Sequence, residues 1–210
     1  MTWRIGACVC AVLLLPLSAE GQAIQRVRSK AFPLAVTLSV GPSWGGMRAG
    51  DRDTTVVEHG IGSGPKVGLE LQFPLAGTFG IGLAAQGGRP SRVLCNPTCV
   101  SPDRLTTIHG AGLILWRFKA QAPIYFGFGP ALSYIKPGAV STQTSAVTEI
   151  GGALVAGYDF ALSPTIGGRL AWWNYFLKPS TDDLPATFVP SSLVWDTQVA
   201  IGVRFVFGGL

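Results

Sequence analysis

Apolar and polar residues alternate with a period of two along most of the chain after residue 34. In the segment 66–73, for example, Val67, Leu69 and Phe73 form one set, and Lys66 and Glu70 belong to the other. Such alternation is the pattern of β-strands with one apolar face. It recurs in eight segments, namely 35–44, 66–73, 79–86, 107–118, 124–134, 149–160, 166–176 and 195–207. The pattern predicts an all-β chain.

The fourth segment is the least regular. Ile114, Trp116 and Phe118 fit the apolar face, but Leu113 and Leu115 then join the opposite face. That face also holds His109 and Arg117. A β-bulge and an incorrect assignment of the faces are both open explanations at this stage.

The connections between these segments alternate in length. Short turns are expected at 74–78, 119–123 and 161–164, and long polar loops at 45–65, 87–104, 136–146 and 178–192. Short periplasmic turns and long external loops are typical of outer-membrane barrels. A soluble β-sandwich has no reason to sort its loops in this way.

Composition narrows the class further. Only 13% of the 210 residues are charged and 28 are glycine, and after the N-terminus no apolar run is long enough for a membrane-spanning helix. The other structure that satisfies all backbone polar groups in lipid is a closed β-barrel. We therefore expect an eight-stranded antiparallel up-and-down transmembrane barrel over residues 34–210.

The N-terminus has the features of a secretory leader. Arg4 supplies the positive charge, an apolar stretch follows from Ile5 to Leu17, and small residues come next. Cleavage after Ala19 or Ala23 fits, and Ala23 fits better because Gly21 is a second small residue two positions earlier. This predicts a signal peptide over 1–23 and a periplasmic lead over 24–33.

Aromatic residues gather near the ends of the expected strands. One group lies near the short turns and another, with Trp44, Tyr134, Phe176 and Trp195, near the long loops. Two such groups are the interfacial girdles expected of a membrane barrel.

The mature chain resembles the outer-membrane β-barrel domain family, the small eight-stranded barrels of the OmpA and OmpX kind. The terminal segment 195–207, ending in Phe205-Val-Phe207, is similar to the strand by which the assembly machinery recognises such proteins. Gly208, Gly209 and Leu210 follow that phenylalanine, whereas the family pattern usually ends on it. The resemblance implies residence in the outer membrane, contact with lipid and lipopolysaccharide, and passage through the barrel-assembly machinery.

The inferred lumen face carries charges of both signs. A barrel of about eight strands is just filled by its side chains, so we expect these charges to pair into a plug that closes the lumen. The inward glycines, among them Gly80, Gly127 and Gly157, are expected to make room for the long charged side chains. The expected lumenal network consists of Lys66, Glu70, Glu149, Asp159, Arg169 and Arg204. Within it we expect Glu149 or Asp159 to pair with Arg169 or Arg204.

Four cysteines fall into two pairs. Cys8 and Cys10 leave with the leader, whereas Cys95 and Cys99 remain in an oxidising compartment. A lone pair there favours a disulfide, which we expect to staple the second long loop.

No motif points to an enzyme, a metal site or a cofactor. The two histidines, His59 and His109, lack an arrangement resembling lipid-modifying barrels, and the charges form no basic stripe of the kind that binds nucleic acid. The sequence predicts a non-enzymatic scaffold that displays long loops. A small pore, a soluble lipid-binding barrel with its apolar face inward and, less favoured, a lipid-modifying enzyme are the alternatives.

Overall fold

A computed structural model describes residues 32–51, 58–96, 98–100, 104–119, 122–136, 146–178, 188–190 and 194–207. The predicted signal peptide lies outside these residues. Within them, no helix is long and apolar enough to cross a membrane.

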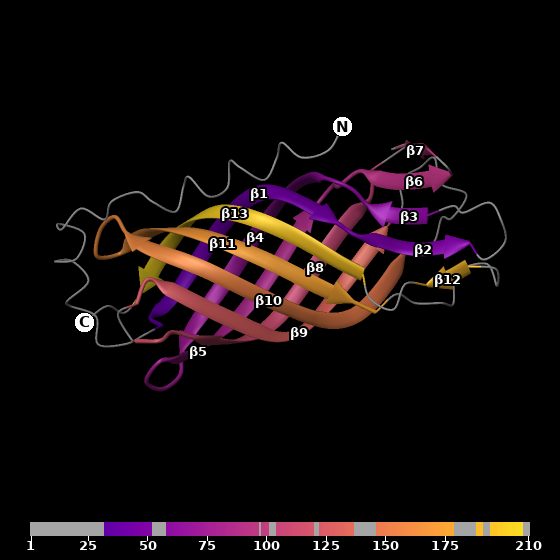
Figure 1. Ribbon diagram of the computed structural model, residues 1–210. Coiled ribbons are helices and arrows are strands. Elements are labelled where there is room, and N and C mark those ends of the chain that lie inside the picture. Colours follow the sequence, from indigo (N-terminus) through magenta and orange to yellow (C-terminus); the bar gives the residue numbers. More distant parts are fainter. Residues whose placement is uncertain are drawn as a thin grey trace.

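Eight long strands form a closed barrel (Figure 1). Each strand is antiparallel to both neighbours, and each short connection joins strands that are adjacent in the wall. The barrel strands are β1 (Leu34–Gly45), β4 (Gly64–Pro74), β5 (Phe79–Gly88), β8 (Thr106–Trp116), β9 (Ile124–Lys136), β10 (Val147–Ala161), β11 (Ile166–Leu177) and β13 (Val194–Phe207).

The first strand closes the barrel. β1 pairs with β13 from Leu34 opposite Phe207 to Gly45 opposite Asp196, and it pairs with β4 along its other edge. The first and last strands of the barrel are therefore hydrogen-bonded to each other, so the barrel wall has no open edge. The eight-stranded antiparallel barrel predicted from the sequence is present.

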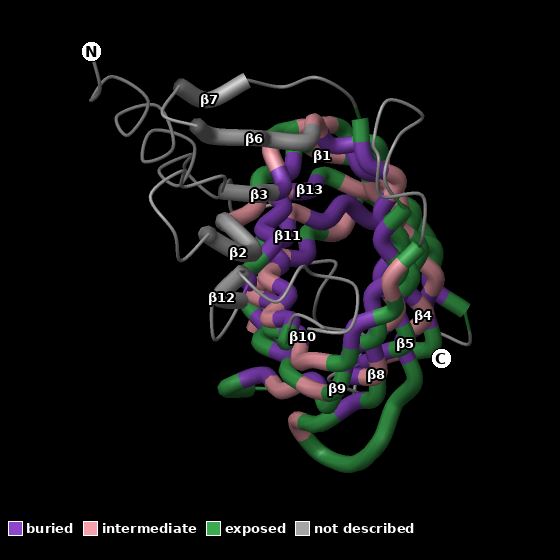
Figure 2. Tube along the Cα trace, turned by 90° about the vertical axis from the view of Figure 1, so that its right-hand side faces the viewer, coloured by how far each residue is buried: buried purple, intermediate pink, exposed green. Residues whose placement is uncertain are grey.

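The apolar face of the wall is the outer one. Leu38, Val67 and Ile201 are 54%, 62% and 61% exposed, whereas Thr37 and Lys66, which precede the first two, point inward and are each 1% exposed. Buried and exposed positions alternate along the wall strands in Figure 2. A soluble barrel that holds lipid inside would have the opposite arrangement, so the structure argues against that alternative.

The fourth barrel strand needs no bulge. The pairing of β8 with β5 runs without a shift from Thr107 to Trp116, and Leu113 and Leu115 are buried. These two side chains do point inward, together with His109 and Arg117. Leu113 and Leu115 therefore line the lumen.

In two of the short turns, particular residues favour the observed backbone conformation. In the β4–β5 turn, Gly77 has a φ of 55°, a conformation that glycine adopts without steric cost. In the β10–β11 turn, the Ser163 hydroxyl accepts hydrogen bonds from the backbone amides of Thr165 and Ile166, at 3.3 and 3.0 Å.

The long loops contain a second sheet that the sequence analysis did not predict. Its five strands are β12 (Phe188–Pro190), β2 (Met47–Asp51), β3 (Glu58–Ile61), β6 (Arg92–Asn96) and β7 (Thr98–Val100), in that order. Figure 1 shows it at the right-hand end of the barrel.

This second sheet continues the barrel wall. β2 follows β1, β3 precedes β4, β6 follows β5, β7 precedes β8 and β12 precedes β13, so its strand order repeats that of five neighbouring barrel strands. Hydrogen bonds bridge the junction, as from the Gly62 amide to the Ser91 carbonyl at 2.7 Å. The described part of the wall is thus extended on one side of the mouth only. His59, expected in an irregular loop, lies instead in β3.

Candidate functional site

The structure places all six expected lumenal residues in the barrel wall with buried side chains. They divide between two ends of the lumen. Near the short turns lies the turn-end cluster, which consists of Glu70, Gln72, Arg117, Asp159, Arg169 and Arg204. Near the long loops lies the loop-end cluster, which consists of Lys66, His109, Ser133 and Asp196.

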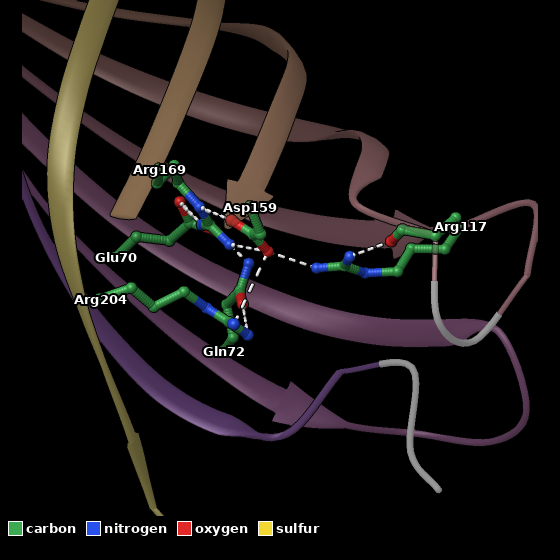
Figure 3. A network of polar contacts seen from close by, with 7 residues as sticks. Glu70, Gln72, Arg117, Asp159, Arg169 and Arg204 are labelled. Carbon is green, nitrogen blue, oxygen red and sulfur yellow. Dashed lines mark hydrogen bonds and ion pairs between the residues drawn. The ribbon is translucent and has the colours of Figure 1, made fainter. Parts of the chain in front are cut away.

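Arg169 is the centre of the turn-end cluster (Figure 3). It lies directly opposite Asp159 in the β10–β11 ladder. Its Nε and Nη2 atoms donate to the two carboxylate oxygens of Asp159 at 2.6 and 2.9 Å, and its Nη1 donates to Glu70 at 2.7 Å. The guanidinium also lies 4.4 Å from the centre of the Tyr125 ring. One side chain therefore joins β4, β9, β10 and β11 across the lumen.

Two further arginines complete this cluster. Arg117 pairs with Asp159 and donates to the Ala122 carbonyl, while Arg204 donates to Gln72 at 3.0 Å and lies 3.8 Å from Asp159. Gln72 in turn donates to Glu70 at 2.8 Å. Arg117 and Gln72 were absent from the expected network, although the period-two alternation already placed both on the inward face.

The loop-end cluster is built around one carboxylate oxygen. Asp196 Oδ2 lies 2.5 Å from Lys66 Nζ and 3.0 Å from His109 Nε2, and those two nitrogens are themselves 3.0 Å apart. The other ring nitrogen of His109 lies 2.6 Å from Ser133 Oγ, and its ring stacks on Tyr175 at 4.4 Å. Alternation had placed Asp196 and His109 inward, but the sequence did not show that they meet.

Ser133, His109 and Asp196 have the composition of a nucleophilic triad. All three are fully buried, and Lys66 occupies the space beside both His109 and Asp196. A triad acts on a substrate that reaches its hydroxyl and an oxyanion site. In the described structure Ser133 is fully buried, and the contacts among these three residues link β8, β9 and β13.

Of the two carboxylates expected as alternative partners of Arg169 or Arg204, Asp159 lies in the turn-end cluster and Glu149 does not. It is buried near the loop end, opposite Ser133 in the β9–β10 ladder, and Ser133 is in turn opposite His109 in the β8–β9 ladder. The expected pairing of Asp159 with Arg169 is present, whereas Glu149 belongs to the other end of the lumen.

An aromatic side chain ahead of the first strand also fills the turn end. Phe32 is 1% exposed, lies edge-on to Tyr125 with ring centres 6.3 Å apart, and has the Arg117 guanidinium 4.7 Å from its own ring centre. A Cβ at Gly80 would lie 2.7 Å from the Phe32 ring. Only a glycine at position 80 leaves space for this ring.

Three of the inward glycines make room for uncharged side chains, whereas Gly88 makes room for Lys66, as expected: a Cβ at Gly88 would clash with the Lys66 side chain. Gly80 makes room for Phe32, Gly157 for the Tyr125 ring, and Gly127 for Leu115 and Val155. At these three positions, aromatic and aliphatic side chains occupy the space that the sequence analysis had assigned to charged ones. Between the two polar clusters the inward residues are also small or apolar, including Ala84, Ala111, Leu113, Ala131, Ala153 and Ala171.

The described lumen is balanced in charge. Four cations, Lys66, Arg117, Arg169 and Arg204, lie with four carboxylates, Glu70, Glu149, Asp159 and Asp196. Equal numbers of buried opposite charges at close range limit the cost of removing them from water. Among the described residues, no group of His, Cys, Asp and Glu side chains is arranged to hold a metal ion.

Comparison with known proteins agrees with this architecture. The outer membrane protein OprG from Pseudomonas aeruginosa superposes with a TM-score of 0.59 at 12% identity, covering 83% of this chain and 97% of OprG. The fold is that of a small outer-membrane β-barrel. Neisserial surface protein A (14% identity, 82% and 99% covered, TM-score 0.48) and Ail of Yersinia pestis (12%, 82% and 99%, 0.44) also match. No protein-family model and no curated protein matches the chain.

Replacing Arg169 tests the turn-end cluster. Arg169→Met keeps much of the side-chain volume but leaves Asp159 and Glu70 buried without their main partner. We expect the free energy of unfolding to fall by about 3–5 kcal/mol, the usual cost of breaking a buried pair. Denaturant titration of the barrel in lipid vesicles measures it. Lys178→Met, at an exposed position, is the control and should change stability by less than about 0.5 kcal/mol. Equal stability of Arg169→Met and the parent would show that the turn-end cluster does not stabilise the barrel.

The fit of Phe32 against Gly80 gives a second prediction. Gly80→Ala should destabilise the barrel by about 1–3 kcal/mol, the usual cost of overpacking. Phe32→Ala removes a buried ring and is itself destabilising, but in that background Gly80→Ala should cost less than about 0.5 kcal/mol, because the new methyl group then has room. Thermal unfolding of both single variants and the double variant checks this coupling. Additive losses in the double variant would show that the two residues do not interact.

Proposed function

We propose that this protein is a non-enzymatic outer-membrane scaffold, which presents the five-stranded second sheet at the cell surface and does not conduct through its lumen. The observation that carries the proposal is the one-sided continuation of the barrel wall into that sheet. A rigid barrel that holds irregular or extended loops in place is a common platform for binding. The fold shared with OprG supports the outer membrane as the location.

The contents of the lumen support the closed state. Arg169 spans from β10 and β11 to Glu70 on β4, and Phe32 fills the adjoining space beside Tyr125. At the opposite end, Lys66, His109 and Asp196 connect β4, β8 and β13. A small open pore is the alternative. It would require at least two buried clusters to rearrange at once.

The same proposal covers how the chain reaches its location and what it touches there. The terminal strand β13 ends with outward-facing aromatic residues, Phe205 and Phe207, which are 37% and 50% exposed. We expect the assembly machinery to recognise this strand, and lipid and lipopolysaccharide to surround the apolar wall.

Two measurements on the same preparation test the scaffold. In planar bilayers the folded protein should give no stable conductance step, because charge pairs fill both ends of the lumen. In intact cells, added protease should cut within the long loops and leave a protected barrel fragment that still shows heat-modifiable gel mobility. A large, stable conductance would replace the scaffold with a pore. A chain that protease never reaches, or that fractionates as soluble protein, would refute the surface location.

Cys95 and Cys99 are proposed to form a disulfide in this sheet. The β6–β7 ladder places them directly opposite each other, and the Cα atoms of such cross-strand pairs are about 4.5–5.5 Å apart, within bridging range. Mass spectrometry of unreduced peptides from exported protein should find the two linked. Two thiols that react fully with an alkylating reagent would contradict the proposal.

A further inference from the structure

Charged side chains divide by sign between the inside and the outside of the barrel. Where side-chain exposure is described, all four carboxylates are buried in the lumen. The exposed charged residues are all cations, namely Arg89, Arg104, Lys119, Lys136 and Lys178. Since the described lumen is neutral as a whole, these five exposed cations carry the net positive charge of the residues whose side-chain exposure is described.

Three of these cations gather at the loop end of the wall. Arg89 directly follows β5, and Lys136 is the last residue of β9, opposite Thr106. Arg104 forms an isolated backbone β-bridge with Ser91, two residues before β8 begins. They belong to three neighbouring strands, β5, β8 and β9, which together are about 10 Å wide. We name Arg89, Arg104 and Lys136 the rim patch. Within the described residues none of the three has an ion-pair partner.

The rim patch shares its face with the apolar outer wall. Because side chains alternate between the two faces of a strand, Arg89 faces outward like Leu83, Arg104 like Ile108, and Lys136 like Tyr134. These three apolar or aromatic side chains are 49%, 51% and 38% exposed. The cations therefore sit where an apolar wall gives way to its polar end. In a membrane barrel this is the level of the lipid headgroups.

The wall below the patch is recessed. Gly110 and Gly112 on β8 belong to the outward set, and a Cβ added at either would have no atom within 4 Å. Exposed Leu83, Ile108 and Leu132 stand beside them on the same three strands. A hydrocarbon chain that descends from the patch would lie against this surface.

We infer that the rim patch binds the phosphate groups of a phosphorylated glycolipid in the outer leaflet, and that an acyl chain of the same molecule lies along the recessed wall. Arginine guanidinium groups form paired hydrogen bonds with phosphate oxygens, and lysine adds a point charge. The buried carboxylates cannot compete for these cations. The inference rests on the proposed outer-membrane location.

The test uses the whole mature barrel in phosphatidylcholine nanodiscs, titrated with bis-phosphorylated lipid A and with lipid A stripped of both phosphates. A cation near an anionic lipid surface changes binding about five-fold, so Arg89→Gln/Arg104→Gln/Lys136→Gln should weaken binding of the phosphorylated lipid about 100-fold. Binding of the stripped lipid should not change. Lys119→Gln, at the opposite rim, is the matched control and should bind both lipids as the parent does. Excess inorganic phosphate should not displace the lipid.

Two outcomes would overturn the rim patch as a lipid site. One is equal binding of phosphorylated lipid A by the triple variant and the parent. The other is a triple variant that unfolds more easily than the parent in detergent without lipid, because the cations then serve carboxylates of the loops. Failure of the proposed function is distinguishable, since a chain that is not a membrane barrel would neither enter nanodiscs nor show heat-modifiable mobility.

Discussion

The pairing of every wall strand with two neighbours is the constraint on which the rest of this structure depends. A sheet with an apolar outer surface cannot leave backbone amides and carbonyls unpaired there, because no water would satisfy them. Closure through the β1–β13 and β1–β4 ladders removes both edges. Closure also sends alternate side chains inward, so the polar residues of each strand must find partners in a lumen that eight strands make narrow.

The lumen therefore plays the role of a core, although many of its buried residues are polar or charged. Its two polar clusters lie near the two ends, where strands β10 and β11 bring Asp159 to Arg169 and strands β4 and β13 bring Lys66 to Asp196. Between them the wall contributes alanine, leucine and valine. An unpaired charge buried in the lumen would be strongly destabilising. The four buried cations are matched in number by four buried carboxylates, which limits this cost.

The mouth of the barrel is not symmetric. β13, β1, β4, β5 and β8 continue into the second sheet through β12, β2, β3, β6 and β7, while no described strand extends β9, β10 or β11. The rim patch lies where the extended and the short sides meet, on β5, β8 and β9. In the described structure the second sheet therefore lies on one side of the mouth, with the three cations of the rim patch at its border.

The sequence by itself determined the strand count, the facing of the wall and the identity of most inward residues. It did so because a period of two is a local property that each strand carries in its own residues, and Lys66, Glu70, Asp159 and Arg169 could all be read from it. Which charges meet was decided only by the tertiary structure. Asp159 reaches Arg169 through the register of two strands, but Arg169 reaches Glu70 across the lumen, and no spacing in the chain encodes that distance. The same limit explains why the sequence left Glu149 and Asp159 as alternative partners of the arginines, why Phe32 was not expected inside, and why the loops were not expected to form a sheet. Each of these depends on segments far apart in the chain that only barrel closure brings together.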